Sequence, residues 1–515
     1  MNVLDRLITW LAPQWGQARA LARLKARHFE SASIGRRTTG FHRLATDANA
    51  AAAGPTLGFL RAQARDLTRN NPWARRGLRR ICGDTVGCGI RPKASGRGAE
   101  RVMQLWRLWG ETTQCDAKGR LTFYGLQRLA MRTIAESGEV LIRRRFRLPM
   151  DGLAVPLQLQ VLEPDYIDTG RDTGAVQLAN GGEIIQGIEF DAIGRRAAYW
   201  LFDRHPGGLG RAINPVSRRV PADGILHVFD QERAGQERGP SWFASVDVRL
   251  HDFDAFEDAT LNKQKIAACM AVFTTDLEGS APALGQPGTD PASGQPIDTF
   301  EPGMIIPLPA GKQVTVANPP AATDHASYSA TTLRGVAAGL GTTYSGMTGD
   351  YSQANYSSER AARNDHQRDV EGWQEHMLVP QLCQPAWSWF VQAAILAGEN
   401  VEDAPADWTS APLPILDPGK ENDADKDAIR SGLKSWATAV RERGYDPDAM
   451  LAEIAEYNAA MDEDEIVLDS DPRHTNSAGQ QQAATTAAPD PAAAAAAATG
   501  DGGDTADTGT SGAEH

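Results

Sequence analysis

Four side chains with acid-base or metal-ligating chemistry recur at helical spacing after residue 244. They are Asp247, His251, Asp254 and Asp258, at positions i, i+4, i+7 and i+11. An α-helix places residues with this spacing on one face. Carboxylates and an imidazole on one face can hold a divalent ion, and a metal-bound water is the nucleophile of many nucleases. One hypothesis is therefore a metal-dependent DNA-processing enzyme.

A hydrated acidic helix face explains the same spacing, and we favour it because nothing upstream supplies a converging ligand. Glu136 and Glu139, in the sequence AESGE, form a second carboxylate pair. There Ser137 and Gly138 predict a helix-to-strand transition rather than a catalytic dyad. His227, in ILHVFD, is interpreted as a core or hydrogen-bonded residue.

Motifs for common catalytic sites are absent from the sequence. It contains no GxxxxGK[ST], GxSxG or HExxH, so nucleotide-binding loops, serine-hydrolase elbows and zinc-protease helices have no support. We therefore expect a chain without catalytic activity, cofactor or metal.

Charge is distributed unevenly over the 515 residues, whose formal net charge is -13. Residues 1–150 carry 28 Lys and Arg against 10 Asp and Glu, which is +18 at the front and leaves -31 behind it. A basic end on an acidic body indicates either a polyanion-facing segment or complementary packing between subunits. A solvated basic face accounts for the same numbers, and the alternatives stay open here.

The five cysteines form no CxxC pair, and with no secretory leader their odd number predicts reduced thiols. No window contains the roughly 18 apolar residues that a membrane span needs. We expect a soluble chain made in the cytoplasm, without a membrane partner.

Hydrophobic periodicity and turn residues predict an α+β architecture built from successive segments. Within it, Asn71 and Pro72 are expected to start a helix, and Val102, Leu105, Trp106 and Trp109 to share one helix face. A helix with kinks at Pro380 and Pro385 is also predicted. The segments are 1–55 (N-terminal arm), 56–244 (α+β), 245–275 (one helix), 276–322 (Gly/Pro-rich with the β patterns MIIPLP and QVTVAN), 323–341 (helix), 342–356 (polar loop), 357–400 (long kinked helix), 401–469 (helical) and 470–515 (disordered tail).

The polar loop lies in an interval without positive charge. Arg334 and Arg360 bracket it, no Lys or Arg lies between them, and Asp350 and Glu359 are its only charges. Such a loop would touch a nucleic acid without binding it tightly. Arginines occur elsewhere in runs, at 75–80 and 143–145, but no recognition helix or aromatic platform accompanies them. Sequence-specific DNA reading is therefore not expected.

Several phrases, in this order, resemble the lambda family of phage portal proteins. The similarity covers residues 56 to about 400, and it rests on the shared order more than on any single phrase. The matching phrases are ARDLTRNNPWARR (64–76), VGCGIRP (86–92), AESGEVLIRRR (135–145), LQLQVLEPDYID (157–168), GIEFDAIGRRAAYWL (187–201), KIAACMAVF (265–273), EPGMIIPLPAGKQV (301–314) and GDYSQANYSSERAAR (349–363).

This resemblance implies a structural ring protein, usually a dodecamer, at one capsid vertex of the virion. Double-stranded DNA would pass through it without sequence specificity during packaging and ejection. The implied partners are other copies of the chain, the terminase large subunit, the major capsid or scaffold protein and head-tail connector proteins, with assembly in the host bacterial cytoplasm. The segments would become wing (56–244), stem helices (245–275 and 323–341), clip (276–322), tunnel loop (342–356) and crown (401–469).

The resemblance also implies which side chains would face the DNA. One departure is that Thr342 and Thr343 stand where an apolar–proline pair is common in the family. The implied loop residues are Thr342, Thr343, Tyr344, Met347, Asp350, Tyr351, Gln353, Asn355 and Tyr356, and the implied stem residues are Asp247, Asp254 and Asp258.

Overall fold

The computed structural model describes residues 47–52, 55–173, 178, 181–208, 216–268, 272–275, 305–308, 325–401, 404–410, 417–468, 471 and 473–474. The chain divides into two compact units, Met1–Pro418 and Gly419–His515. The predicted arm and tail fall almost entirely outside the described residues. No helix in the described part is long and apolar enough to cross a membrane.

Helices open the first unit, and the sequence places their ends well. Asn71 caps α5 by accepting a 2.9 Å hydrogen bond from the Ala74 amide, with Pro72 as the first helical residue. This confirms the predicted start. Helix α6 buries Val102, Leu105, Trp106 and Trp109 on one side, which is the predicted face. These helices are α3 (Ala48–Ala51), α4 (Thr56–Asn70), α5 (Pro72–Val86), α6 (Ala99–Trp109) and α7 (Phe123–Ser137).

Two antiparallel sheets follow and confirm the α+β class. A three-stranded sheet has the order β3-β2-β8, and a four-stranded sheet has the order β4-β5-β6-β7. Strand β2 (Glu139–Phe146) is central in the first sheet and continues directly from α7. The other strands are β3 (Leu157–Leu162), β4 (Glu183–Ile185), β5 (Ile188–Phe190), β6 (Arg196–Phe202), β7 (Ser217–Pro221) and β8 (Ile225–Phe229), with 3-10 turns η3 (Thr113–Cys115), η4 (Pro149–Asp151), η5 (Pro164–Tyr166), η6 (Ala222–Gly224) and η7 (Trp242–Ser245).

An aromatic cluster holds the helices together. The Trp106 ring lies 5.0 Å from Phe123, 5.2 Å from Trp387 and 5.1 Å from Phe390. These rings come from α6, α7 and α12, and Trp106 and Phe390 are fully buried. Truncating one such aromatic side chain to alanine typically costs about 3–5 kcal/mol. The cluster therefore joins segments almost 300 residues apart in the chain.

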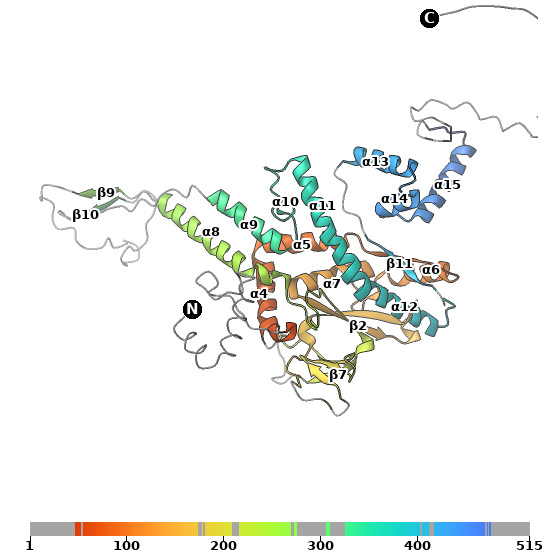
Figure 1. The fold of residues 1–515 in the computed structure, drawn as a ribbon, viewed down its shortest axis with the longest axis horizontal. Coiled ribbons are helices and arrows are strands. Elements are labelled where there is room, and N and C mark those ends of the chain that lie inside the picture. Colours follow the sequence, from red (N-terminus) through yellow and green to blue (C-terminus); the bar gives the residue numbers. More distant parts are fainter. Residues whose placement is uncertain are drawn as a thin grey trace, which may run out of the picture. The chain divides into compact units, whose positions relative to one another are not determined.

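Helices α8 (Asp247–Ala268) and α9 (His325–Gly339) lie side by side, with the Phe256 and Tyr328 rings 4.4 Å apart (Figure 1). The predicted helix 245–275 is wrong at its end, because β9 (Val272–Thr275) pairs in parallel with β10 (Ile305–Leu308). The sequence VFTT is β-branched and aromatic, which suits a strand. Strand β10 confirms the pattern MIIPLP, whereas QVTVAN lies outside the described residues.

The predicted kinked helix is one helical run with a change of type. It comprises α11 (Tyr356–Gly372), the π-helix η8 (Trp373–Cys383) and α12 (Gln384–Leu396). Pro380 lies inside η8, and Pro385 occupies the first turn of α12. A proline inside a helix removes one amide donor, and the chain around Pro380 adopts the wider π form.

The predicted boundary at residue 401 is also wrong. Strand β11 (Ala406–Thr409) pairs antiparallel with β1 (Arg91–Ala94), so this stretch belongs to the first unit. The second unit contains α13 (Pro418–Arg430), α14 (Trp436–Glu442) and α15 (Pro447–Glu463). Within it, Asp425 forms ion pairs with Lys434 at 2.8 Å and with Arg443 at 2.7 Å. The predicted helical character of this region is confirmed for α13, α14 and α15, which lie between Pro418 and Glu463.

A fully buried carboxylate lies where α7 passes into β2. Gly138 ends α7 with φ 91°, which confirms the predicted helix-to-strand transition. Next to it, Glu139 accepts hydrogen bonds from Arg61 at 2.5 Å, from Arg238 at 2.6 Å and from the Gly239 amide at 3.1 Å. Burial favours the neutral acid, yet the charges of Arg238 and Arg61 and the hydrogen bond from His227 hold the pKa of Glu139 well below its usual range.

His227 completes this cluster from β8, which confirms that it is a hydrogen-bonded core residue. Its Nε2 lies 2.8 Å from Glu139, while its Nδ1 has no hydrogen-bond partner among the described residues. Burial lowers the pKa of His227 from 6.5 to about 4 despite the neighbouring carboxylate. One pKa unit corresponds to about 1.4 kcal/mol, so protonation of His227 costs the folded state about 3 kcal/mol.

We expect the melting temperature of the protein to fall as the pH is lowered from 7 to 4. Because the folded pKa of His227 lies below its unfolded value of 6.5, the unfolded chain takes up the proton first, and stability is lost between pH 6.5 and about 4. Glu139 adds to the loss below its unfolded pKa of 4.5. The variant His227→Gln removes the loss of stability that comes from His227 and keeps the loss that comes from Glu139. Calorimetric curves of melting temperature against pH that run parallel in both proteins would contradict this account.

Candidate nucleic-acid interface

The predicted loop 342–356 contains a short helix that the sequence did not reveal. Gly341, with φ 66°, ends the α9 region, and α10 (Tyr344–Thr348) follows. Thr343 caps α10 by accepting a 3.1 Å hydrogen bond from the Gly346 amide. Gly349, with φ 74°, ends it. Positive φ favours glycine at both turns, so the loop has defined entry and exit points.

The exposed part of the loop is uncharged apart from Asp350 and runs to the start of α11. Tyr351 is 56 % exposed and Tyr356 is 44 % exposed. Asn355 caps α11 through a reciprocal pair of hydrogen bonds with Ser358. Of the residues implied by resemblance, the exposed ones are Asp350, Tyr351, Gln353, Asn355 and Tyr356, while Thr343 and Tyr344 are half-buried.

Two of the implied loop residues are buried inside this unit. Met347 is 0 % exposed and Thr342 is 8 % exposed. Met347 packs at Gly77 of α5, where an added Cβ would meet its side chain. Their side chains thus anchor the loop and take no part in its exposed surface. The spacing alone could not show this, because the α10 helix that turns Met347 inward is only five residues long.

Arginines of α5 contact the loop 342–356 and support its backbone. The Arg76 Nε donates to the Gly346 carbonyl oxygen at 3.2 Å. An added Cβ at Gly349 would meet the Arg76 guanidinium, and one at Gly346 would meet Arg80. Two of the four arginines in the basic run on α5 therefore have contacts within the protein, Arg76 with the loop backbone and Arg80 with Asp84.

Side-chain contacts also tie the loop to α9 and α11. Ser345 donates to Glu359 at 2.8 Å, and the Tyr344 hydroxyl donates to Asp350 at 3.1 Å. Hydrogen bonds from Ser352, together with that from Tyr344, lower the pKa of Asp350. The Arg334 guanidinium lies 5.2 Å from the centroid of the Tyr344 ring. Asp350 therefore remains an anion on the exposed surface.

His366 of α11 connects three elements beneath the loop. Its Nδ1 lies 2.9 Å from the Gly341 carbonyl oxygen, and its Nε2 lies 2.8 Å from Asp84 of α5. Asp84 also pairs with Arg80 at 2.6 Å. These contacts join the start of the loop to α11 and α5.

The acidic residues of α8 do not form a metal site. Asp247 is buried and accepts from the Val248 amide at 2.6 Å, while Asp254 accepts from the Asn71 amide group at 2.8 Å. His251 and Asp258 are exposed. Among the described residues, these four do not belong to any group of three potential ligands within 4.8 Å of one another. The geometry gives the metal-dependent enzyme hypothesis no support.

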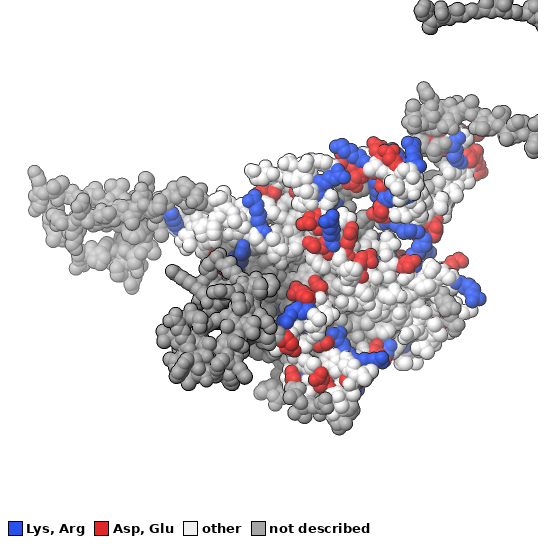
Figure 2. All heavy atoms as spheres, in the orientation of Figure 1, with Lys and Arg blue, Asp and Glu red and all other residues white. Residues whose placement is uncertain are grey.

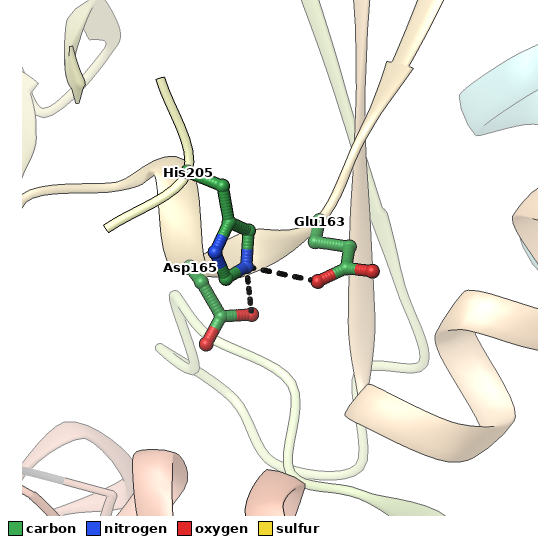
Figure 3. Close-up of side chains that lie close together, drawn as sticks. All are labelled: Glu163, Asp165 and His205. Atoms are coloured by element: carbon green, nitrogen blue, oxygen red, sulfur yellow. Dashed lines mark hydrogen bonds and ion pairs between the residues drawn. The ribbon is translucent and has the colours of Figure 1, made fainter. Parts of the chain in front are cut away.

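The group that does meet this distance criterion is Glu163, Asp165 and His205 (Figure 3). His205 Nδ1 accepts from the Gly207 amide at 3.0 Å, so in the neutral ring the proton is on Nε2, which lies 3.0 Å from Glu163. Nε2 then has no lone pair for a metal. The Arg65 guanidinium also contacts both carboxylates, at 2.5 and 3.2 Å. We interpret this cluster as an ion-pair network.

The described residues on the face drawn in Figure 2 do not present a continuous basic patch. On the face drawn in Figure 2, basic and acidic side chains are interspersed over the described elements. A protein that binds DNA tightly or sequence-specifically would instead concentrate Lys and Arg on one face. The α+β fold and the exposed polar loop fit a structural protein, the class to which phage portal proteins belong.

Comparison with known proteins makes this assignment specific. A family model described as "Phage portal protein, lambda family" matches residues 34–374. The chain belongs to the lambda family of phage portal proteins, and its role is that of a portal at the capsid vertex.

Individual relatives agree with the family. The "Probable portal protein" of Halomonas phage phiHAP-1 is 28 % identical over 420 residues, covering 77 % of this chain and 79 % of the relative. "Portal protein B" of Escherichia phage lambda is 22 % identical over 448 residues, covering 76 % and 82 %. The "Portal protein" of Escherichia phage N15 is 22 % identical over 452 residues, covering 78 % and 84 %.

Solved structures give a weaker likeness. A chain from the neck of an empty gene transfer agent particle is 18 % identical with a TM-score of 0.39, covering 78 % of this chain and 98 % of that one. A chain from the neck of the native particle is 16 % identical with a TM-score of 0.38, covering 75 % and 94 %.

We expect His366→Ala to destabilise the protein by about 1–3 kcal/mol, because it leaves Asp84 without one buried partner. Amide hydrogen exchange should also accelerate between residues 341 and 349, since the bond to the Gly341 carbonyl is lost. The matched control is Asp365→Ala, an exposed position one residue earlier on α11. Faster exchange spread evenly over the whole chain would show that His366 does not act on the loop.

Proposed function

We propose that copies of this chain form a ring whose central channel carries double-stranded DNA during packaging and ejection. Membership of the portal family carries this proposal. The ring is assembled in the host bacterial cytoplasm and has no catalytic activity of its own. Its partners are the terminase large subunit and later head-tail connector proteins, together with the major capsid or scaffold protein.

The structural segments take the following roles in this proposal. Residues 56–244, joined by 404–410, form the wing, and α8 and α9 form the stem. The stretch 276–322, of which the structure describes only 305–308, is the clip that meets the motor. The loop 342–356 lines the channel, and the second unit from Gly419 forms the crown.

The chemistry of the loop supports its position against moving DNA. Its exposed part, Asp350 to Tyr356, carries no Lys or Arg and one carboxylate. Each phosphate that a cation neutralises adds affinity, which the next step of translocation would have to break. Contacts of Arg76, Met347 and His366 at the base of the loop hold the exposed part, Asp350 to Tyr356, in place. A loop without positive charge, repeated around a ring, can touch DNA and still release it.

On the stem, Asp258 is the exposed member of the implied acidic face. Asp247 and Asp254 have hydrogen-bond donors within the unit. In the proposal, Asp258 adds repulsion toward a polyanion, and the other two residues serve mainly to fix the start of α8.

Electron microscopy of the purified chain should show rings with a central hole. The expectation follows from the family assignment, and the images test ring assembly directly. Varying the ionic strength controls for salt-dependent association of charged surfaces. A preparation that contains only monomers or two-fold dimers under all these conditions would overturn the ring.

In an infection assay, Asp350→Lys and Tyr351→Ala should leave the rings intact and lower the amount of nuclease-protected DNA per particle several-fold. The added lysine binds a phosphate in every copy around the ring, whereas the alanine removes a contact surface. Glu375→Lys, an equal charge change at an exposed position in η8, is the control. Normal packaging by both loop variants would remove the loop from the mechanism.

A further inference from the structure

A cavity lies between the segment 230–245, the end of α9 and α11. Its volume is about 370 Å³, and small residues such as Ala244, Ala338 and Gly339 form part of its wall. The Trp242 and Trp373 rings line it, with centroids 4.8 Å apart and planes tilted by 42°. The cavity therefore has small residues on one part of its wall and two indole rings on another.

Three carboxylates line the same cavity: Asp230, Glu232 and Asp369. Within the described part of the chain, the carboxylates of these three residues form no hydrogen bond or ion pair. Burial and the nearby charge of Glu232 raise the pKa of Asp230. The cavity thus holds negative charge that nothing in the described structure neutralises.

The spacing of these groups selects the kind of cation that fits. The three carboxylates do not bring ligand atoms within 4.8 Å of one another, so they do not form a metal site. An arginine side chain reaches several carboxylates at once, and its planar guanidinium stacks on indole rings. DNA is excluded, because its phosphates would meet only negative charge.

The chain itself contains a basic segment that precedes the described residues near the cavity. Residues 1–46, which lie outside the described residues, contain eight Lys and Arg against two Asp and Glu. The described chain begins at Asp47, and Asn49 is held by the segment that carries the acids. Asn49 donates to the Gly235 carbonyl oxygen at 2.9 Å and accepts from the Glu237 amide at 3.0 Å. The basic segment therefore enters the described structure beside Glu232.

The chain between Arg43 and Asn49 is long enough for Arg43 to reach the cavity of its own copy. Glu232 is three residues from Gly235, which corresponds to at most about 11 Å of extended chain. Arg43 is six residues from Asn49, which corresponds to at most about 20 Å. We propose that residues 1–46 dock on their own copy of the chain, with Arg36, Arg37 or Arg43 placed in the Trp242–Trp373 cavity. This inference does not depend on the ring, because all the groups belong to one chain.

Carbodiimide cross-linking tests the proposal in the full-length protein. The variant Arg36→Lys/Arg37→Lys/Arg43→Lys keeps the charge and adds amines that couple to nearby carboxylates. Mass spectrometry should find links to Asp230, Glu232 or Asp369 in a gel band with the mass of one chain. Links in a band of two chains would overturn docking on the same copy. The absence of links to these three acids would overturn the cavity as the docking site.

Limited trypsin digestion gives a second readout on the unmodified arginines. Docking shields the bonds after Arg36, Arg37 and Arg43, so Asp230→Asn/Asp369→Asn should raise their cleavage rate several-fold. High salt should raise it in the wild type and not in the variant. Asp365→Asn, exposed on α11 and outside the cavity, is the control. Equal rates in the wild type and the cavity variant would overturn the proposal.

Discussion

The buried charge of Glu139 is the interaction on which the packing of α4, α7, β2 and β8 depends. An ionised carboxylate without contact to water is tolerated only when cations and donors surround it. Arg61 comes from α4, His227 from β8 and Arg238 from the segment before η7, so the carboxylate fixes three elements against the α7–β2 junction. Removing one member of such a cluster leaves a buried charge unpaired, which typically costs about 3–5 kcal/mol. The same junction needs Gly138, since a Cβ there would collide with the backbone at Gly239 and Pro240.

A second buried group, His366, holds the base of the candidate channel loop through its contacts with the Gly341 carbonyl oxygen and Asp84. Helix α5 lies beneath the loop and presents Asp84 to His366 and Arg76 to the loop backbone. The loop can then be polar and weakly binding at its exposed tip, because its position is set by buried groups at its base. This division explains why Met347 lies inward while Tyr351 and Tyr356 lie outward.

Local sequence signals predicted the local structure well. The Asn71 cap, the buried face of α6 and most strands follow from spacing and turn residues. Contacts between distant segments were not predictable in this way. The residues around Glu139 are 78 to 100 positions away, so the sequence identified the junction and not its ion cluster. For the same reason β11 was assigned to a later segment, although it pairs with β1 more than 300 residues before it. The strand VFTT was hidden by its position at the end of a long helical pattern.

The charge asymmetry of the chain can now be interpreted through its partners. Several basic residues of the first 150 pair with acids further along the same chain, as Arg65 does with Asp165, Arg101 with Glu399 and Arg144 with Asp223. Within the arginine run of α5, Arg76 donates to the loop backbone and Arg80 pairs with Asp84. Part of the basic front is therefore neutralised by packing within the protomer, whereas the exposed Arg76 keeps its positive charge beside the candidate channel loop.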